Sequence, residues 1–385
     1  MKINKCTVGL VAAGLISLAV NAEEKMVTTP LLTALSSTTI SGYIDTSAHW
    51  NPGTGNANPA PYSFNAGKQD GFNIDSVMLS VSKPLEEGQW SSGYQLDLSF
   101  GPDSGAVNNP ATAPLSGFGL SEHVRQAYVV LRAPVGNGLD FTIGRFDTIL
   151  GFESSDAYKN PNYTRSYGYT ITPTEHTGVL MAYHVSDLLS LKAGVANTIN
   201  TLSLNSRNGN GTESQKAYLA GLTLTAPDSA GFLKGSVLNV AALHGPTTAP
   251  GAQATDISLN GSLATPLEGL RIGATWDELF DVGVPHTWVG GAYASFRPAP
   301  ESKLSFHARG EYYHGAGALL GVAPAKAHIW AATGTIQYDL WQNVISRLEV
   351  RWDRSDSGKI FGGTVAGTPT KRNDFTVAAN VIYKF

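Results

Sequence analysis

The sequence predicts an all-β fold, a transmembrane antiparallel up-and-down β-barrel of about sixteen strands. Three observations lead to this fold class. Apolar and polar residues alternate repeatedly after residue 38, short and long connections alternate strictly, and the chain opens with a secretory signal. A period of two places the apolar side chains on one face of a strand and the polar side chains on the other.

The N-terminal stretch "MKINKCTVGLVAAGLISLAVNA" has the features of a signal peptide. Lys2 and Lys5 precede an apolar run that is too short for a membrane helix, and small residues follow the run. We therefore predict a signal peptide at 1–22, a short periplasmic segment at 23–38 and the barrel at 39–385. Cys6 is the only cysteine and would leave with the signal peptide, which excludes a disulfide framework.

Charge and composition narrow the function classes. The chain of 385 residues carries 26 Lys and Arg against 30 Asp and Glu, a net charge of −4. This balance excludes nucleic acid as a partner, since nucleic-acid binding needs a basic footprint. The histidines are scattered without metal-ligand spacing such as H-E-x-x-H, so we predict neither a metal site nor a cofactor.

Sixteen segments show the alternation of apolar and polar residues. A tilted strand needs about nine to eleven residues to cross a bilayer, and each segment is about that long or longer. The predicted strands lie near 39–50, 72–83, 88–100, 122–133, 138–147, 174–185, 187–199, 215–226, 231–243, 253–264, 267–278, 287–299, 301–314, 326–338, 342–354 and 372–385.

The clearest alternations, in chain order, set an apolar face against a charged one. They are "GYQLDLSF" (93–100), "LRIGATWD" (270–277), "KLSFHARGEYY" (303–313) and "RLEVRWD" (347–353). In a membrane barrel the apolar face meets lipid and the polar face lines the interior. The residues predicted to point inward are Asp45, Asp97, Arg271, Asp277, Arg309, Glu311, Arg347, Glu349, Arg351 and Asp353.

The last segment, "DFTVAANVIYKF" (374–385), ends on an aromatic residue. We predict that it pairs with the first segment (39–50), because closure leaves no strand edge in lipid. Val381, Tyr383 and Phe385 share its apolar face. This ending resembles the C-terminal signal that the barrel-assembly machinery reads in outer-membrane proteins.

The connections between the predicted strands alternate between short and long along the chain. Short ones such as "PLEEG", "PVGNG" and "TPLEG" alternate with long ones such as 51–70, 101–121 and 148–172. An outer-membrane barrel has tight turns at the periplasmic rim and longer loops outside. A soluble β-sandwich would show the same alternation along its strands, but it gives no reason for sorted connections.

The central stretch "RFDTILGFESSDAYKNPNYTRSYGYTITPTEHTGV" (145–179) resembles the OmpL-like outer-membrane β-barrel porin family. The resemblance extends from about residue 39 to the C-terminus, although "NTINTLSLN" (197–205) departs from the family's Gly-Trp-Asp-like stretch. It implies a porin in the outer membrane of a Gram-negative bacterium, a passive channel for small hydrophilic solutes or ions. The implied partners are outer-membrane lipid and lipopolysaccharide, the barrel-assembly machinery and, as in general porins, a homotrimer.

The loop at 148–172 is predicted to constrict the pore. It is the third long connection and is rich in charged and aromatic residues, among them Glu153, Asp156 and Arg165. A constriction sets acidic groups against basic ones across the lumen. We expect Glu153 and Asp156 to face a basic cluster drawn from Arg271, Arg309, Arg347 and Arg351. The alternative is an external loop whose charges are solvated.

Two other functions remain open. The barrel could serve adhesion or structure, with external loops that bind a partner. A barrel enzyme with its site at the rim would need a nucleophile, a base and an orienting group, and the sequence has no G-x-S-x-G elbow. We therefore predict no catalytic residues. The solute, the charge selectivity and the oligomeric state do not follow from the sequence.

Overall fold

A computed structural model of the chain describes residues 37–53, 55–65, 67–86, 88–104, 123–199, 204–208, 212–249, 251–281 and 283–385. These residues form sixteen strands. The strands are β1 (Thr39–Trp50), β2 (Gly71–Lys83), β3 (Ser91–Phe100), β4 (Val124–Ala133), β5 (Leu139–Asp147), β6 (Glu175–His184), β7 (Leu189–Ala196), β8 (Ala217–Thr225), β9 (Val237–Pro246), β10 (Gln253–Ala264), β11 (Leu270–Asp281), β12 (Thr287–Phe296), β13 (Leu304–Ala316), β14 (Lys326–Trp341), β15 (Val344–Ser355) and β16 (Asn373–Lys384).

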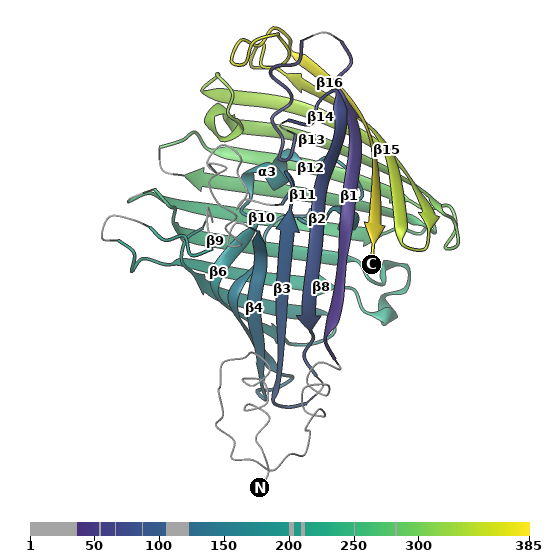
Figure 1. Ribbon diagram of the computed structural model, residues 1–385. Helices are drawn as coiled ribbons and strands as arrows, with labels where there is room; N and C mark the ends of the chain where they lie inside the picture. Colours follow the sequence, from purple (N-terminus) through teal and green to yellow (C-terminus); the bar gives the residue numbers. More distant parts are fainter. Residues whose placement is uncertain are drawn as a thin grey trace, which may run out of the picture.

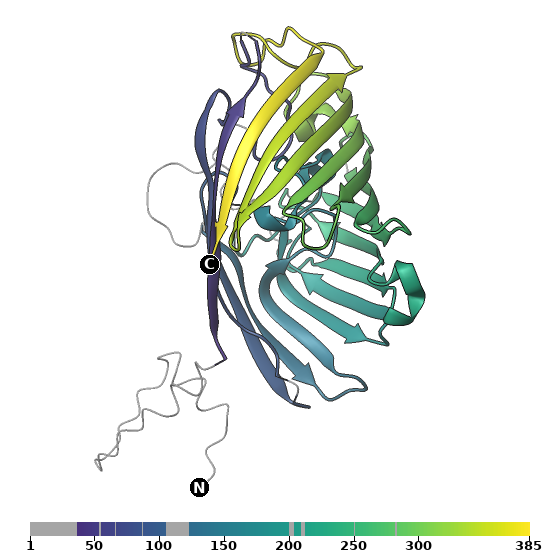
Figure 2. The same ribbon diagram turned by 90° about the vertical axis from the view of Figure 1, so that its right-hand side faces the viewer.

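The strands form one closed antiparallel barrel in which each strand pairs with its sequence neighbours and β16 pairs with β1. Figures 1 and 2 show the yellow last strand beside the purple first strand. Asp45 lies opposite Ile382 in this pairing, and Gly42 and Phe385 exchange two backbone hydrogen bonds of 3.0 Å. The predicted closure is confirmed, and it satisfies the backbone groups that an open edge would leave bare in lipid.

The two faces of the wall separate as the alternation predicts. On β15, Arg347, Glu349 and Arg351 are buried inside the barrel, while Leu348 and Trp352 are exposed on the outside. On β16 the outward residues include Val381 and Tyr383, and Phe385 follows the strand directly; the three side chains are between 42% and 51% exposed. In a membrane barrel, an apolar outer surface of this kind is the one that meets lipid.

Strand nine is the clearest correction to the predicted boundaries. The predicted strand at 231–243 lies at 237–246, because residues before it form a 3-10 segment, η4 (Asp228–Leu233). Gly231 and Gly235 have φ values of 62° and 70°, a left-handed conformation that interrupts extended backbone. The predicted strands at 88–100 and 187–199 are likewise shortened to β3 and β7.

Long loops fill much of the barrel interior. The connection from β5 to β6 carries two short helical segments, η3 (Ala157–Lys159) and α3 (Tyr167–Ile171), and a third, η5 (Gly317–Leu320), follows β13. Figures 1 and 2 both place α3 inside the barrel. Tyr167 and Ile171 of α3 pack in one buried cluster with Tyr313, Ile329 and Phe361. This apolar cluster lies inside the barrel against β12 to β14, and a second one, which includes Leu180 and Leu219, lies against β5 to β11.

The described residues contain no helix that is long and apolar enough to span a membrane. The predicted signal peptide (1–22) and nearly all of the predicted periplasmic segment (23–38) lie outside the described residues, as does most of the predicted loop at 101–121.

Candidate functional site

Residues 148–174, here called the inward loop, enter the barrel between β5 and β6. Ser166 starts α3 as its N-cap, and its side-chain oxygen accepts a 3.0 Å hydrogen bond from the Tyr169 amide. A loop buried in this way has few backbone partners of its own, so its N–H and C=O groups need partners from the wall. Charged side chains of the wall supply them.

Carboxylates bind the amide groups of the inward loop. Glu349 on β15 accepts hydrogen bonds from the amides of Tyr163 (2.6 Å) and Thr164 (2.9 Å). Glu311 on β13 accepts one from the Tyr167 amide at 2.6 Å. Each carboxylate of the wall thus holds the loop at a defined point of its backbone, with charge-assisted bonds.

Arginines bind the carbonyl groups of the same loop. Arg309 donates to the Thr164 carbonyl at 2.7 Å, and Arg351 donates to the Arg165 carbonyl at 2.6 Å. Arg347 donates to the Asn160 carbonyl at 2.7 Å. The planar guanidinium suits this role because it presents several donors in a fixed geometry.

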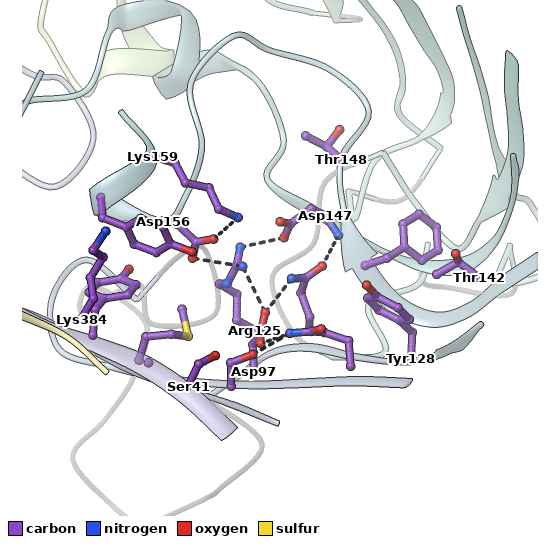
Figure 3. Close-up of a pocket in the computed structure, with 18 of the residues that line it drawn as sticks. Ser41, Asp97, Arg125, Tyr128, Thr142, Asp147, Thr148, Asp156, Lys159 and Lys384 are labelled. Carbon is purple, nitrogen blue, oxygen red and sulfur yellow. Dashed lines mark hydrogen bonds and ion pairs between the residues drawn. The ribbon is translucent and has the colours of Figure 1, made fainter. Parts of the chain in front are cut away.

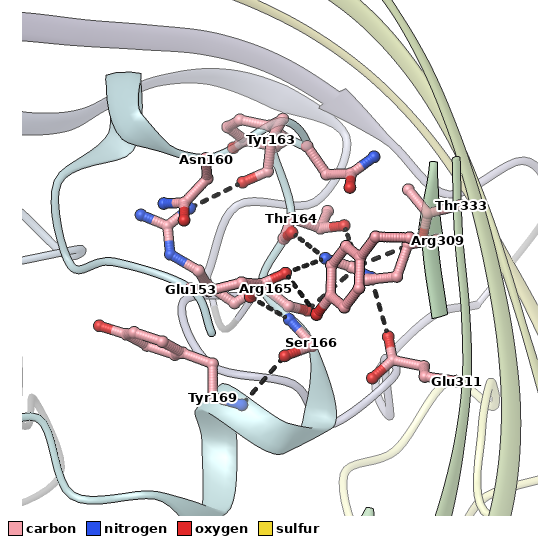
Figure 4. Close-up of polar contacts among 12 residues, drawn as sticks. Glu153, Asn160, Tyr163, Thr164, Arg165, Ser166, Tyr169, Arg309, Glu311 and Thr333 are labelled. Carbon is pink, nitrogen blue, oxygen red and sulfur yellow. Dashed lines mark hydrogen bonds and ion pairs between the residues drawn. The ribbon is translucent and has the colours of Figure 1, made fainter. Parts of the chain in front are cut away.

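The anchoring charges also pair with one another (Figure 4). Arg309 forms ion pairs with Glu153 of the loop at 2.8 Å and with Glu311 of its own strand at 3.1 Å. Arg351 pairs with Asp353 at 2.9 Å. All five side chains are at most 1% exposed. This side of the barrel, β11 to β16, is called the anchored wall below.

A second external loop, residues 51–70, packs over the inward loop. The Arg351 guanidinium lies 3.7 Å from the centre of the Tyr62 ring, and the Ser63 amide donates to the Thr170 hydroxyl at 2.9 Å. Asp374 on β16 accepts a 2.8 Å hydrogen bond from the Ala60 amide. The two loops therefore occupy the interior beside the anchored wall together.

A buried lysine joins loop 51–70 to the opposite side of the barrel. Lys68 pairs with Asp75 at 2.7 Å and with Asp103 at 2.6 Å. Burial raises the pKa of Asp103 to about 6, although Lys68 opposes the shift. Burial would lower the pKa of Lys68, but the two carboxylates outweigh it and raise that pKa. Lys68 therefore stays charged at neutral pH.

Open space remains on the other side, along β2 to β9, which is called the open wall below. A cavity of about 720 Å³ lies there, and Figure 3 shows Arg125 among the side chains that line it. Arg125 contacts three carboxylates, Asp147 at 2.8 Å, Asp97 at 3.2 Å and Asp156 at 3.3 Å. A second cavity of about 280 Å³ lies beside the inward loop and β7 to β9.

The loop contributes its own charges to the large cavity. Asp156 pairs with Lys159 at 2.7 Å. Burial would lower the pKa of Lys159, but Asp156 outweighs it and raises that pKa. Two ammonium groups lie near the Tyr158 ring, that of Lys159 at 5.7 Å and that of Lys384 at 5.5 Å from its centre. The cavity is thus lined by both signs of charge.

The structure brings together only part of the predicted site. Glu153 forms an ion pair with Arg309, one of the four arginines predicted to face it. Asp156 instead forms its described ion pairs with Arg125 and Lys159, neither of which belongs to the predicted basic cluster. Arg271 is not in the cluster: it donates to the Gly235 carbonyl at 2.8 Å, near the turn before β9.

The other predicted site residues lie on the inner face or within the loop. Asp45 accepts from Asn380 at 2.9 Å, and Asp97 accepts from Gln126 at 2.6 Å. Arg165 donates to the carbonyls of Tyr163 and Ser155 and so stabilises the loop from within. Whether these residues constrict a pore stays a prediction, as does the role of the last strand in barrel assembly.

Sequence reasoning missed the charges that line the open space. Asp147 and Lys192 line both cavities, yet neither was singled out, and Lys159 was noted only as one of the charges of the loop. For Lys192 the sequence does carry a signal, because it is a lone charge in an otherwise uncharged alternating strand. Among the described residues, no group of His, Cys, Asp and Glu side chains is arranged to hold a metal ion.

Comparison with known proteins places this barrel among outer-membrane porins. The model of the family described as "Putative beta-barrel porin-2, OmpL-like" matches residues 37–385. A search of curated protein sequences finds no significant match.

Solved porin structures share the fold at low sequence identity. An anion-selective porin from Comamonas acidovorans is 13% identical with a TM-score of 0.58, over 91% of this chain and 99% of that chain. OprB of Pseudomonas putida is 10% identical with a TM-score of 0.60, over 92% and 96%. The trimer form of OmpT from Vibrio cholerae is 11% identical with a TM-score of 0.55, over 90% and 99%.

Proposed function

Because this chain belongs to the OmpL-like β-barrel porin family and is an outer-membrane porin channel, we propose that it conducts small hydrophilic solutes or ions by passive diffusion. The proposed path runs between the inward loop and the open wall. The inward loop is the proposed constriction, since it occupies the other side of the lumen.

One observation carries this proposal: the inward loop is fixed to the anchored wall by buried charges. Glu311 and Glu349 bind loop amides, and Arg309, Arg347 and Arg351 bind loop carbonyls. A loop held at so many points keeps a fixed distance from the opposite wall. A fixed distance and charged walls are what a selective diffusion channel needs.

The same contacts argue against a catalytic site. The closest approach to a catalytic set in the sequence is Ser166 as nucleophile, His176 as base and Glu175 as acid. Each of these side chains has a different structural partner. His176 Nε2 lies 3.0 Å from the Thr148 hydroxyl, and Glu175 pairs with Arg145 at 3.2 Å. Ser166 caps α3. We therefore propose a channel without enzymatic activity.

The proposed partners follow from the location in the outer membrane. We propose contact with lipopolysaccharide and outer-membrane lipid on the apolar outer face, insertion by the barrel-assembly machinery through the strand ending at Phe385, and assembly into a trimer. OmpT of Vibrio cholerae, which shares the fold, has a trimer form. We propose export by the predicted signal peptide at 1–22, and a partner-binding role of the external loops remains the alternative function.

The test is to insert the refolded mature chain into a planar lipid bilayer and to record single-channel currents. Discrete open steps are expected, together with exclusion of uncharged polymers above a size limit. A barrel that folds, as judged by heat-modifiable migration in gels, but never conducts would overturn the channel and leave the external loops as the functional part.

A further inference from the structure

One stretch of the open wall carries a single charge. In the residues of β7, β8 and β9 there is one Lys and no Arg, Asp or Glu, and that residue is Lys192. Its partners across the sheet are Ala182 on β6 and Gly221 on β8. Neither neighbour has a carboxylate or a bulky side chain. The ammonium group of Lys192 therefore extends from a part of the wall that has small cross-strand neighbours and no ion-pair partner in these strands.

Lys192 also stands where the two cavities meet. The residues that line both cavities are Asp147, Thr148, Ile149 and Lys192. The first three belong to the end of β5 and the start of the inward loop, and Lys192 belongs to the wall. The boundary between the two cavities is thus formed by the base of the loop and by Lys192.

The charges other than Lys192 that line the large cavity are equal in number for the two signs. Asp97, Asp147 and Asp156 share Arg125, and Asp156 also pairs with Lys159. Lys384 also lines the large cavity, and its ammonium group lies 5.5 Å from the centre of the Tyr158 ring. None of the ion pairs found among the described residues includes Lys192, whose side chain is exposed to the lumen.

We propose that Lys192 determines the charge selectivity of the pore and that the solutes it favours are small anions. This inference rests on the proposed channel function. An unpaired positive charge at the boundary of two cavities with low-dielectric walls raises the local concentration of anions and lowers that of cations. The other charges that line the large cavity, Asp97, Asp147 and Asp156 against Arg125, Lys159 and Lys384, have a much weaker net field, because equal numbers of the two signs largely cancel.

The experiment compares reversal potentials of the full mature chain and its variants in a planar bilayer with a KCl gradient. The variants are Lys192→Gln, which removes the charge, and Lys192→Glu, which inverts it. Lys326→Glu is the matched control, because Lys326 is exposed at the start of β14, outside the path, and the substitution changes the net charge equally. Heat-modifiable migration confirms that each variant folds.

The wild-type channel is expected to prefer chloride over potassium. Lys192→Gln should lower the chloride-to-potassium permeability ratio by roughly threefold, and Lys192→Glu should lower it further and reverse the sign of the potential. Raising the salt concentration should weaken all these differences through screening. Lys326→Glu should behave as wild type.

Three results would overturn the proposal in distinguishable ways. Open channels whose reversal potential is the same in wild type and both Lys192 variants would remove Lys192 as the determinant. A wild-type preference for potassium would remove the anion preference. Folded wild-type barrels without any open steps would instead overturn the channel function on which the inference rests.

Discussion

The anchored wall and the open wall both carry many charges, but they use them differently. Arg309, Arg351 and Glu311 on the anchored wall are at most 1% exposed and contact the inward loop. The Asp147 side chain on the open wall is 39% exposed and lines both cavities. A charge on the inner face of a porin therefore need not face the solute, because a loop can cover it.

The largest expected effect comes from breaking the anchored wall at its centre. Arg309→Met leaves the carboxylates of Glu153 and Glu311 buried with fewer positive partners and removes the donor to the Thr164 carbonyl. We expect the free energy of unfolding to fall by about 3 to 5 kcal/mol. The released loop should also increase the single-channel conductance.

Urea unfolding of the refolded barrel and bilayer recordings measure the two effects. Arg309→Lys is the matched variant, since it keeps the charge and loses the planar set of donors, and it should lie between wild type and Arg309→Met. Unchanged conductance in an Arg309→Met barrel that is measurably less stable would show that the loop does not set the width of the path.

The next effect concerns the Lys68 cluster, which links the two walls, and it depends on pH. The pKa of Asp103 is raised by burial from 3.8 to about 6. A raised pKa in the folded state gives a contribution to stability that is fully present below pH 3.8 and is lost as the pH rises through 6. The loss amounts to about 2 to 3 kcal/mol over that window.

Asp103→Asn should remove this dependence. The measurement is the free energy of unfolding of wild type and Asp103→Asn between pH 4 and pH 7, and the difference between the two curves isolates the group. Parallel curves over this range would mean that Asp103 titrates normally and that Lys68 fully compensates its burial.

The alternation of residues predicts the fold well because it is a local property of each strand. The predicted segment 253–264 coincides with β10, and the pairing of the last strand with the first follows from the need to close the sheet. Boundaries fail at places such as Gly231 and Gly235, where backbone conformation overrides the pattern.

The site is harder to predict because it depends on an aperiodic segment. The sequence indicates that Glu349 and Arg351 face inward, but only the fold of residues 148–174 decides that both are covered. The same fold directs Asp156 to Arg125 rather than to β13 or β15. The alternation gives the side of the wall on which a charge lies, and the loop determines whether the charge is accessible.

A smaller effect is expected from Asp256 on β10, between the two walls. Neither carboxylate oxygen of this fully buried side chain has a hydrogen-bond partner among the described residues, and its cross-strand neighbours are Leu243 and Leu279. Asp256→Leu should raise the free energy of unfolding by about 1 to 3 kcal/mol, because it removes an uncompensated polar group.

Asp277 on the adjacent β11 is the matched comparison. It accepts hydrogen bonds from Ser258 and Thr275, both at 2.7 Å, so Asp277→Leu should destabilise the barrel. Urea unfolding of the two variants in parallel measures the contrast. A loss of stability in Asp256→Leu as large as in Asp277→Leu would indicate that Asp256 has a function in the fold that its described contacts do not reveal.

The smallest effect is expected from Arg271, which the sequence groups with Arg309 and the structure separates from it. Arg271 is partly exposed and donates to the Gly235 carbonyl and the Ser262 hydroxyl near the rim of short turns. Arg271→Met removes these two bonds without leaving a buried carboxylate unpaired. The free energy of unfolding should therefore fall by no more than about 1 kcal/mol, and the conductance should stay at the wild-type value. Arg309→Met makes the same change of residue type at the anchored position, so the two variants are measured side by side. An equal loss of stability at both positions would mean that contact with the inward loop does not distinguish the two arginines. A much larger loss at Arg309 would assign that stability to its contacts with the inward loop.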